Sequence, residues 1–184
     1  MGLAASGYAW TMASPTLASI RADVSSAAYG YLRRCSWMAD LPGDAPLLEE
    51  FAAPALALME SGKRTRAALL AAAYLSAGAG DIAPAIHAGA AVELYQASAL
   101  VHDDVIDHAQ IRRGVPTGHV AFAQAHRKAG WLGDEADFGA AGAILLGDLL
   151  LSLSTEACLR ACGLAPDGGR RALADFARMT GEVA

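Results

Sequence analysis

Residues 100–107 read Leu-Val-His-Asp-Asp-Val-Ile-Asp, and Arg112-Arg113-Gly114 follow a few positions later. This stretch gathers the carboxylates of Asp103, Asp104 and Asp107 beside two guanidiniums, in a chain otherwise rich in alanine and leucine. Charges held near apolar surface are costly unless an ion of opposite sign neutralises them. A divalent cation that carries a phosphorylated ligand is the simplest neutraliser, so the cluster is a candidate metal site.

The spacing of the aspartates fits a helix. Residues four apart on an α-helix lie one above the other, whereas neighbours diverge by about 100°. Asp103 and Asp107 therefore point together and can hold Mg²⁺, which completes its oxygen shell with water and substrate phosphates. Asp104 lies off this face and is expected to support the site. The alternative is a solvated acidic surface, but residues 88–100 are mostly apolar or small, which predicts a buried helix.

A second candidate site is the basic segment 61–66, Ser-Gly-Lys-Arg-Thr-Arg, where a glycine ends one helical pattern and basic residues open the next. Lys63 and Arg66 are three apart and are expected to share a helix face. Backbone N–H groups and the positive dipole end at a helix start favour an anion. The segment thus predicts a diphosphate pocket, although taken alone it also fits a basic surface turn.

In their order and spacing, these motifs resemble the all-trans polyprenyl diphosphate synthases, the head-to-tail chain-elongating enzymes of isoprenoid synthesis. The matching blocks are 62–66, 93–107, 112–119, 143–150 and 180–183. The resemblance implies an all-α isoprenoid synthase fold, with antiparallel helices around a central cavity, in a single domain spanning residues 1–184. It also implies a homodimer.

The resemblance assigns roles to individual residues. Asp103 and Asp107 match the first aspartate-rich motif, which binds Mg²⁺ bridging the diphosphate of the allylic substrate. Arg112 matches an arginine that contacts that same diphosphate. The residues that match the site for the second substrate, isopentenyl diphosphate, are Lys63, Arg66, Gln96 and Arg113. Many members carry histidine where this chain has Gln96, and some carry glutamine.

The implied reaction is Mg²⁺-assisted prenyl transfer. Ionising an allylic C–O bond leaves a carbocation and an anionic leaving group, which metal ions and arginines stabilise as charge develops. The alkene of isopentenyl diphosphate then attacks the cation and a proton is lost. Two other classes stay open: a non-catalytic subunit that pairs with a complete synthase, and a class I terpene cyclase. The cyclase would not need a second cationic site.

Product length is expected to depend on the helix that carries the aspartates. The growing tail would run down its inner face past Ser98 and Ala99, which are small, with Ala99 ~6 Å and Tyr95 ~12 Å below Asp103. Tyr95 is the first large side chain on this route and would form a floor that favours a product of about twenty carbons. Ordinary core packing is the equally open alternative for Tyr95.

Composition excludes several classes. The 184 residues are 54% hydrophobic with a net charge of −5 and no basic stripe, which argues against nucleic acid binding. Cys35, Cys158 and Cys162 do not suggest a disulfide framework or a zinc site, so we expect thiols in a reducing cytoplasm. The first twenty residues lack a signal-peptide pattern, and the charge-free apolar runs are too short to cross a bilayer.

The chain reads as helices, with no convincing strand pattern. The predicted helices cover about 16–39, 45–60 after a cap at Asp44, 63–77, 81–107, 117–128 and 138–162, and a last one follows Gly168-Gly169. Asp134 and Glu135 are interpreted as the acidic start of the long helix rather than as a second metal motif. Members of the family extend into a second aspartate-rich motif that has no counterpart here, so we expect a truncated synthase covering about the first two-thirds of the fold.

Overall fold

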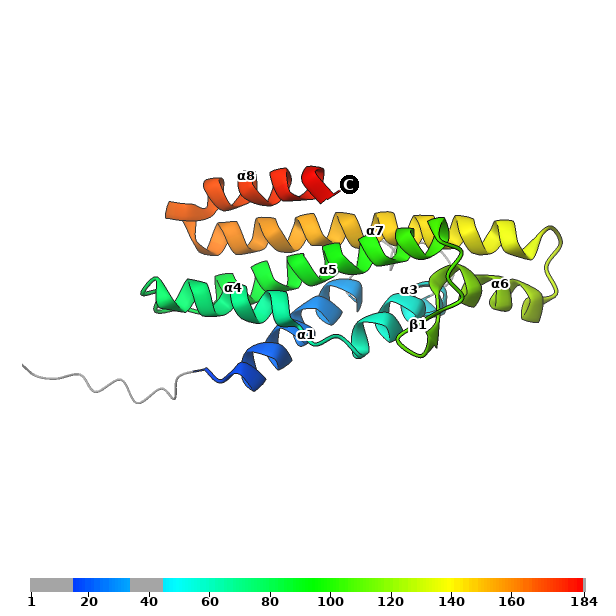
Figure 1. The fold of residues 1–184 in the computed structure, drawn as a ribbon, viewed down its shortest axis with the longest axis horizontal. Helices are drawn as coiled ribbons and strands as arrows, with labels where there is room; N and C mark the ends of the chain where they lie inside the picture. Colours follow the sequence, from blue (N-terminus) through cyan, green and yellow to red (C-terminus); the bar gives the residue numbers. More distant parts are fainter. Residues whose placement is uncertain (1–14, 34–44, 184) are drawn as a thin grey trace, which may run out of the picture.

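The computed structural model describes residues 15–33 and 45–183, and over these residues it confirms the all-α fold. The elements in chain order are α1 (Leu17–Arg33), α3 (Ala45–Glu60), α4 (Thr65–Ser76), α5 (Ala83–Ile106), β1 (Ile111–Arg112), β2 (Val115–Pro116), α6 (Gly118–Ala129), α7 (Glu135–Leu164) and α8 (Pro166–Val183). Figure 1 shows α5 and α7 side by side along the long axis. Helix α8 folds back along α7, and α6 and the hairpin lie at the end where α5 finishes.

The core lies mainly between α5 and α7. Both helices are apolar around most of their circumference, as expected for helices covered on several sides. Small residues let their backbones approach: a Cβ on Gly147 of α7 would lie 2.2 Å from the His102 ring of α5. Leu94, Leu146 and Leu150 are completely buried at this contact. The close approach fixes how the aspartate-bearing end of α5 sits against α7.

Local sequence signals explain where α7 begins and where α6 ends. The carboxylate of Asp134 accepts hydrogen bonds from the backbone N–H groups of Ala136 (2.8 Å) and Asp137 (3.0 Å), which makes Asp134 the N-cap of α7. This confirms the interpretation of Asp134 and Glu135 as a helix start. Helix α6 ends at Gly130, whose φ of 66° is the left-handed conformation that glycine adopts without strain.

Three sequence predictions need correction. A short antiparallel hairpin, in which Ile111 pairs with Pro116, was not expected from the sequence. Its turn residues Arg113 and Gly114 both have positive φ, as type I′ turns require. Helix α8 begins at Pro166 rather than after Gly168-Gly169, since proline suits a first helical position.

The third correction concerns the start of α4. Arg64 has a left-handed backbone (φ 52°) and is the N-cap, so Lys63 precedes the helix and does not share a helix face with Arg66. Residues 34–39 of the first predicted helix, the cap at Asp44, and Cys35 lie outside the described residues.

By length and composition alone, α7 could cross a membrane, and no other helix within residues 15–33 and 45–183 passes the same test. It packs against α5, α6 and α8, as the core helix of a helical domain does.

Candidate active site

The acidic turn at the end of α5 divides its three aspartates between two roles. The Asp107 N–H donates to the Asp103 carbonyl (2.8 Å), so helical geometry continues to Asp107 and the two side chains share a face, as predicted. Both are exposed, with the Asp103 side chain 51% accessible. Asp104 lies off this face and is only 2% exposed. Asp103 and Asp107 are thus available to a ligand, and Asp104 is not.

Arg112 joins two of these aspartates. Its Nε donates to Oδ1 of Asp104 (2.6 Å), and its Nη2 donates to Oδ2 of Asp103 (3.0 Å). Strand β1 carries Arg112 back over the end of α5, so the hairpin missed in the sequence is what makes this contact. A guanidinium has five N–H donors in a fixed fork, so these two bonds leave others for an anion.

The neighbouring Arg113 points to a different part of the fold. It sits in the hairpin turn, and its Nη1 donates to the backbone carbonyl of Leu58 (3.2 Å) near the end of α3. Residues 61–66 follow directly from that end of α3. The hairpin therefore connects the acidic turn of α5 with the basic segment, through one arginine on each side.

Arg64 holds the basic segment in place, a role that was not predicted from the sequence. It is 4% exposed, and its guanidinium donates to the carbonyl of Met59 (2.5 Å) and to Oγ of Ser25 (3.0 Å). Its Nη1 also pairs with Glu93 of α5 at 3.4 Å. A Cβ on Gly62 would lie 1.9 Å from this guanidinium, so Gly62 makes room for it. Three basic residues in four positions gave no sign of which one would be buried.

The two exposed cations of the basic segment, Lys63 and Arg66, flank this buried arginine. Arg66 lies in the first turn of α4, and Lys63 in the irregular turn before it. Neither lines the cavity at Asp103. Arg64 nevertheless ties their segment to Glu93, one helical turn before Gln96 on α5.

A cavity of about 720 Å³ opens beside the acidic turn, between α5, α7 and α8. The predicted site residues that line it are Tyr95, Gln96, Ser98, Ala99 and Asp103. His102, Leu151 and Thr180 complete parts of its wall, and none of them was singled out from the sequence. The structure thus brings Asp103 and the predicted chain-length residues to one cavity, which we call the active-site cavity. Asp104 and Asp107 are not among the residues that line it.

Two of these wall residues are fixed by hydrogen bonds. The buried Ser98 hydroxyl donates to the carbonyl of Gly147 (2.8 Å), which ties α5 to α7. The Tyr95 hydroxyl donates to the carbonyl of Thr180 (3.1 Å), which ties α5 to α8. The Tyr95 ring therefore lies across the lower part of the cavity, in a position consistent with a floor.

The donor set fits magnesium better than a softer metal. Asp103 and Asp107 offer carboxylate oxygens, the ligands that Mg²⁺ prefers, and Mg²⁺ is commonly held by one or two carboxylates plus substrate phosphates. Within residues 15–33 and 45–183, no group of three or more His, Cys, Asp or Glu side chains forms a protein-only metal cage. The arrangement therefore fits a metal that binds together with a phosphorylated ligand.

Two histidines of α6, His119 and His126, are at least partly buried. Nε2 of His119 is buried without a hydrogen-bond partner in the described part of the chain. Burial lowers the pKa of His119 below its ordinary value, and the nearby Asp104 carboxylate only partly offsets this. His126 is buried and stacks near Trp131 and Phe138.

The Asp148 side chain is 63% exposed on α7, with its Oδ1 3.6 Å from Nε2 of His102. Burial and the neighbouring Cys162 together raise the pKa of the Cys158 thiol to about 12. Both Cys158 and Cys162 are free thiols.

Comparison with known proteins places this geometry in a family. Residues 48–184 match the Polyprenyl synthetase family. Geranylgeranyl pyrophosphate synthase 9, chloroplastic, of Arabidopsis thaliana is 38% identical over 67% of this chain, and the alignment covers 31% of that protein. A probable farnesyl diphosphate synthase of Bradyrhizobium diazoefficiens is 40% identical over 64% of the chain, covering 32% of its own length.

A solved structure shares the fold. Geranylgeranyl pyrophosphate synthase from Corynebacterium glutamicum, complexed with isoprenyl diphosphate and magnesium, superposes with a TM-score of 0.68 and 28% sequence identity. The match covers 80% of this chain and 42% of that one. The alignments thus span about a third of the curated relatives and under half of the solved one. On the match to residues 48–184, the chain belongs to the polyprenyl synthetase family.

Proposed function

We propose that the protein condenses isopentenyl diphosphate with an allylic diphosphate in a head-to-tail chain elongation, as a geranylgeranyl-type synthase. The observation that carries this proposal is the shared cavity: Asp103 at its mouth, and an apolar wall below it formed by α5, α7 and α8. Such a cavity suits a ligand with an anionic head and a long hydrocarbon tail. The solved relative complexed with isoprenyl diphosphate and magnesium supports the same ligand class.

Different residues of the chain would hold the metal, contact the diphosphate and position these groups. Magnesium held by Asp103 and Asp107 would neutralise the leaving diphosphate. Arg112 orients the Asp103 carboxylate through its Nη2 and donates to the same diphosphate through its remaining N–H groups. Asp104 holds Arg112 in place through the 2.6 Å bond to Nε. Asp104 is thus a positioning residue in this proposal rather than a metal ligand.

The second diphosphate would bind at the basic segment. Lys63 and Arg66 are exposed, and Arg113 bonds the end of α3 that leads into this segment. Gln96 lines the active-site cavity, and its contact with the second diphosphate stays a prediction. This second cationic site is what favours condensation over a terpene cyclase, which ionises one diphosphate only. Tyr95 as the cavity floor favours a product of about twenty carbons.

Assembly and location are further proposals. We propose a homodimer, supported by the exposed apolar side chains that α7 presents, which are Ile144, Leu145 and Leu159. Light scattering on the purified protein tests it, and a monomer at all concentrations contradicts it. The free thiols Cys158 and Cys162 support a reducing cytoplasm as the location.

The test of the proposed activity is incorporation of labelled isopentenyl diphosphate with dimethylallyl, geranyl or farnesyl diphosphate and Mg²⁺. The assay is run on this chain and on a version extended by the residues that any reading frame after Ala184 encodes. We expect Mg²⁺-dependent elongation, with a KM for isopentenyl diphosphate raised at least ~tenfold in Lys63→Ala and unchanged in the exposed control Lys128→Ala. Cyclised hydrocarbon without incorporated label would contradict the proposal. Turnover only when a longer homologue is added would favour the non-catalytic subunit.

A further inference from the structure

Two thiols that the proposed reaction does not use lie one above the other on α7. Cys158 and Cys162 are four residues apart in this helix, so they share a face with ~5–6 Å between their Cβ atoms. Cys158 is only 5% exposed, Cys162 is half-buried, and both are free thiols. Cys162 contributes to the raised pKa of Cys158, so the two side chains interact. They form a dithiol pair.

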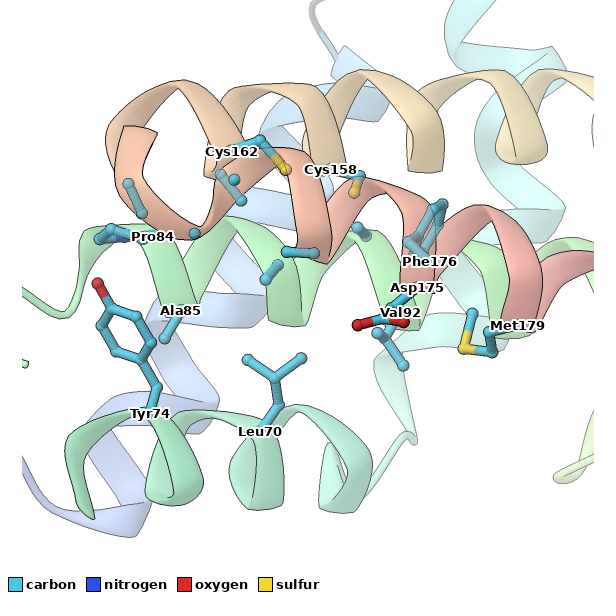
Figure 2. Close-up of a pocket in the computed structure, with 17 residues that line it drawn as sticks. Leu70, Tyr74, Pro84, Ala85, Val92, Cys158, Cys162, Asp175, Phe176 and Met179 are labelled. Carbon is cyan, nitrogen blue, oxygen red and sulfur yellow. The ribbon is translucent and has the colours of Figure 1, made fainter. Parts of the chain in front are cut away.

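The dithiol pair faces a cavity of about 550 Å³ between α4, α5, α7 and α8. Figure 2 shows both cysteine side chains on the side of α7 that is turned toward α5 and α8. The cavity wall is largely apolar. Its carboxylate, Asp175, is mostly exposed and pairs with Arg178 at 3.3 Å. A ligand of the dithiol pair would therefore lie in apolar surroundings.

The protonation state of Cys158 limits the chemistry of the pair. Its pKa of about 12 keeps the thiol protonated at neutral pH, and the thiolate rather than the thiol is the usual nucleophile. Reagents that attack one thiolate should therefore react slowly with Cys158. A ligand that suits the pair binds both sulfurs at once and leaves no net charge, because uncompensated charge in an apolar site is costly.

Trivalent arsenic that carries one organic group meets these conditions. Soft elements are the partners of sulfur ligands, but copper(I) held by two thiolates would leave a negative charge. Zinc takes four ligands in structural sites, and the described ranges offer no group of three or more His, Cys, Asp or Glu side chains. An organic arsenic(III) group bonded to two sulfurs is neutral, and its organic part can occupy the cavity.

We propose that Cys158 and Cys162 form a modification site for monosubstituted trivalent arsenicals, in which one arsenic atom bridges the two sulfurs. For an arsenical R–As=O, both S–H bonds and the As=O bond break, and two As–S bonds form. The two protons leave with the oxygen as water, and neither arsenic nor sulfur changes its oxidation state. The inference goes beyond the proposed prenyl transfer and does not depend on it.

Intact-mass measurement with phenylarsine oxide tests the bridge. We expect one phenylarsenic group per chain, with two hydrogens lost from the protein and two fewer thiols free in a subsequent thiol assay. Cys158→Ser and Cys162→Ser each leave a single sulfur, so the affinity should fall at least ~100-fold through loss of the second, intramolecular bond. Cys35→Ser leaves the pair intact and is the matched control, with wild-type affinity expected.

A variant of the cavity wall tests where the organic group lies. Ala88 of α5 lines the same cavity, and Ala88→Leu leaves less room in it. The affinity for phenylarsine oxide should fall roughly tenfold in this variant through overpacking of the ring. Inorganic arsenite, which carries no ring, should bind the variant and the wild type equally.

Thermal unfolding shows whether the folded protein provides the site. Two thiols four residues apart can also meet in an unfolded chain, and a ligand raises Tm only if it binds the folded state more strongly. We expect phenylarsine oxide to raise the Tm of the wild type and to leave that of Cys162→Ser unchanged. A lowered Tm in the wild type would overturn the inference, because the arsenical would then bind the unfolded chain.

Two further results would also overturn the inference. One is arsenic attached to a single cysteine, and the other is wild-type affinity in Cys162→Ser. If Cys158→Ser does not fold, Cys162→Ser decides the outcome, since its side chain is half-buried and the substitution is nearly isosteric. Phenylarsine oxide that binds Ala88→Leu as tightly as the wild type would contradict the placement of the organic group in the cavity.

Discussion

At the scale of single residues, the three aspartates of the α5 turn differ in environment although they are neighbours in sequence. Asp104 is buried and bonded to Arg112, whereas Asp103 and Asp107 are exposed, and Asp103 lines the active-site cavity. The free energy of folding should therefore depend on Asp104, and ligand binding on the other two.

Urea denaturation of alanine variants measures this difference. Asp104→Ala leaves the Arg112 guanidinium without its buried partner and should lower the free energy of unfolding by about 3 kcal/mol. Asp107→Ala, at an exposed position without a recorded partner among the described residues, should change it by less than about 0.5 kcal/mol. Equal losses in the two variants would show that the division between them is wrong.

His119 gives a pH dependence with a defined sign. Burial holds its pKa below the ordinary value of 6.5, so the unfolded chain binds a proton more readily than the folded one. The stability due to neutral His119 is fully present above pH 6.5 and is lost as pH falls from 6.5 through the lower folded pKa. Urea unfolding between pH 7.5 and 5 should show this decline in the wild type and a smaller one in His119→Phe. An identical slope in both proteins would exclude His119 as its origin.

At the scale of elements, the seam between α5 and α7 positions the site. The His102 ring lies on Gly147, and the Ser98 hydroxyl bonds the Gly147 carbonyl. A methyl group at Gly147 would lie 2.2 Å from this ring, so the His102 side chain would have to rotate away from α7. Because His102 lines the active-site cavity, this movement would change the cavity wall.

Two glycines of α7 make a matched pair for testing this seam. Gly147→Ala should lower the free energy of unfolding by about 1–3 kcal/mol through overpacking. Gly163→Ala, where nothing lies within 4 Å of the added carbon, should leave stability unchanged or raise it by up to about 1 kcal/mol through helix propensity. Thermal unfolding of both variants checks the pair, and a stabilised Gly147→Ala would refute the close approach.

The sequence predicted helices well because their periodic apolar faces and caps are local signals. The Asp134 cap and the apolar runs of α5 and α7 are examples. It missed the hairpin at 111–116, because two-residue strands have no periodicity and the turn carries arginine where asparagine or aspartate is usual. It also misplaced the start of α8, because Gly168 and Gly169 read as a helix breaker. Gly169 instead allows α8 to approach the Cys162 backbone of α7.

The candidate site also combines features with a local sequence signal and features that depend on contacts far apart in the chain. Helical spacing was enough to predict that Asp103 and Asp107 face together and that Asp104 does not. The burial of Arg64 depends on Ser25 and Glu93, 39 and 29 residues away, so no local pattern could reveal it. The ring contact between Tyr95 of α5 and Phe176 of α8 was missed for a similar reason, since it joins helices far apart in the chain.

At the scale of the whole molecule, the acidic turn lies at the end of α5, beside the hairpin and α6 (Figure 1). The Arg64–Glu93 pair ties the basic segment to the middle of α5, and Arg113 of the hairpin bonds the end of α3 that precedes this segment. Apolar space continues along α5 and α7. The proposed function assigns the charged groups to the diphosphates and the apolar space to the hydrocarbon tail. The proposed reaction requires both in one cavity.

Calorimetric titration of farnesyl thiolodiphosphate with and without Mg²⁺ tests the central claim, that Asp103 and Asp107 bind a metal-bridged diphosphate at this cavity. We expect binding that requires Mg²⁺, and an affinity at least ~tenfold lower in Asp103→Asn, with no change in Asp23→Asn on α1. Binding of equal strength without Mg²⁺, or unweakened in Asp103→Asn, would contradict the account.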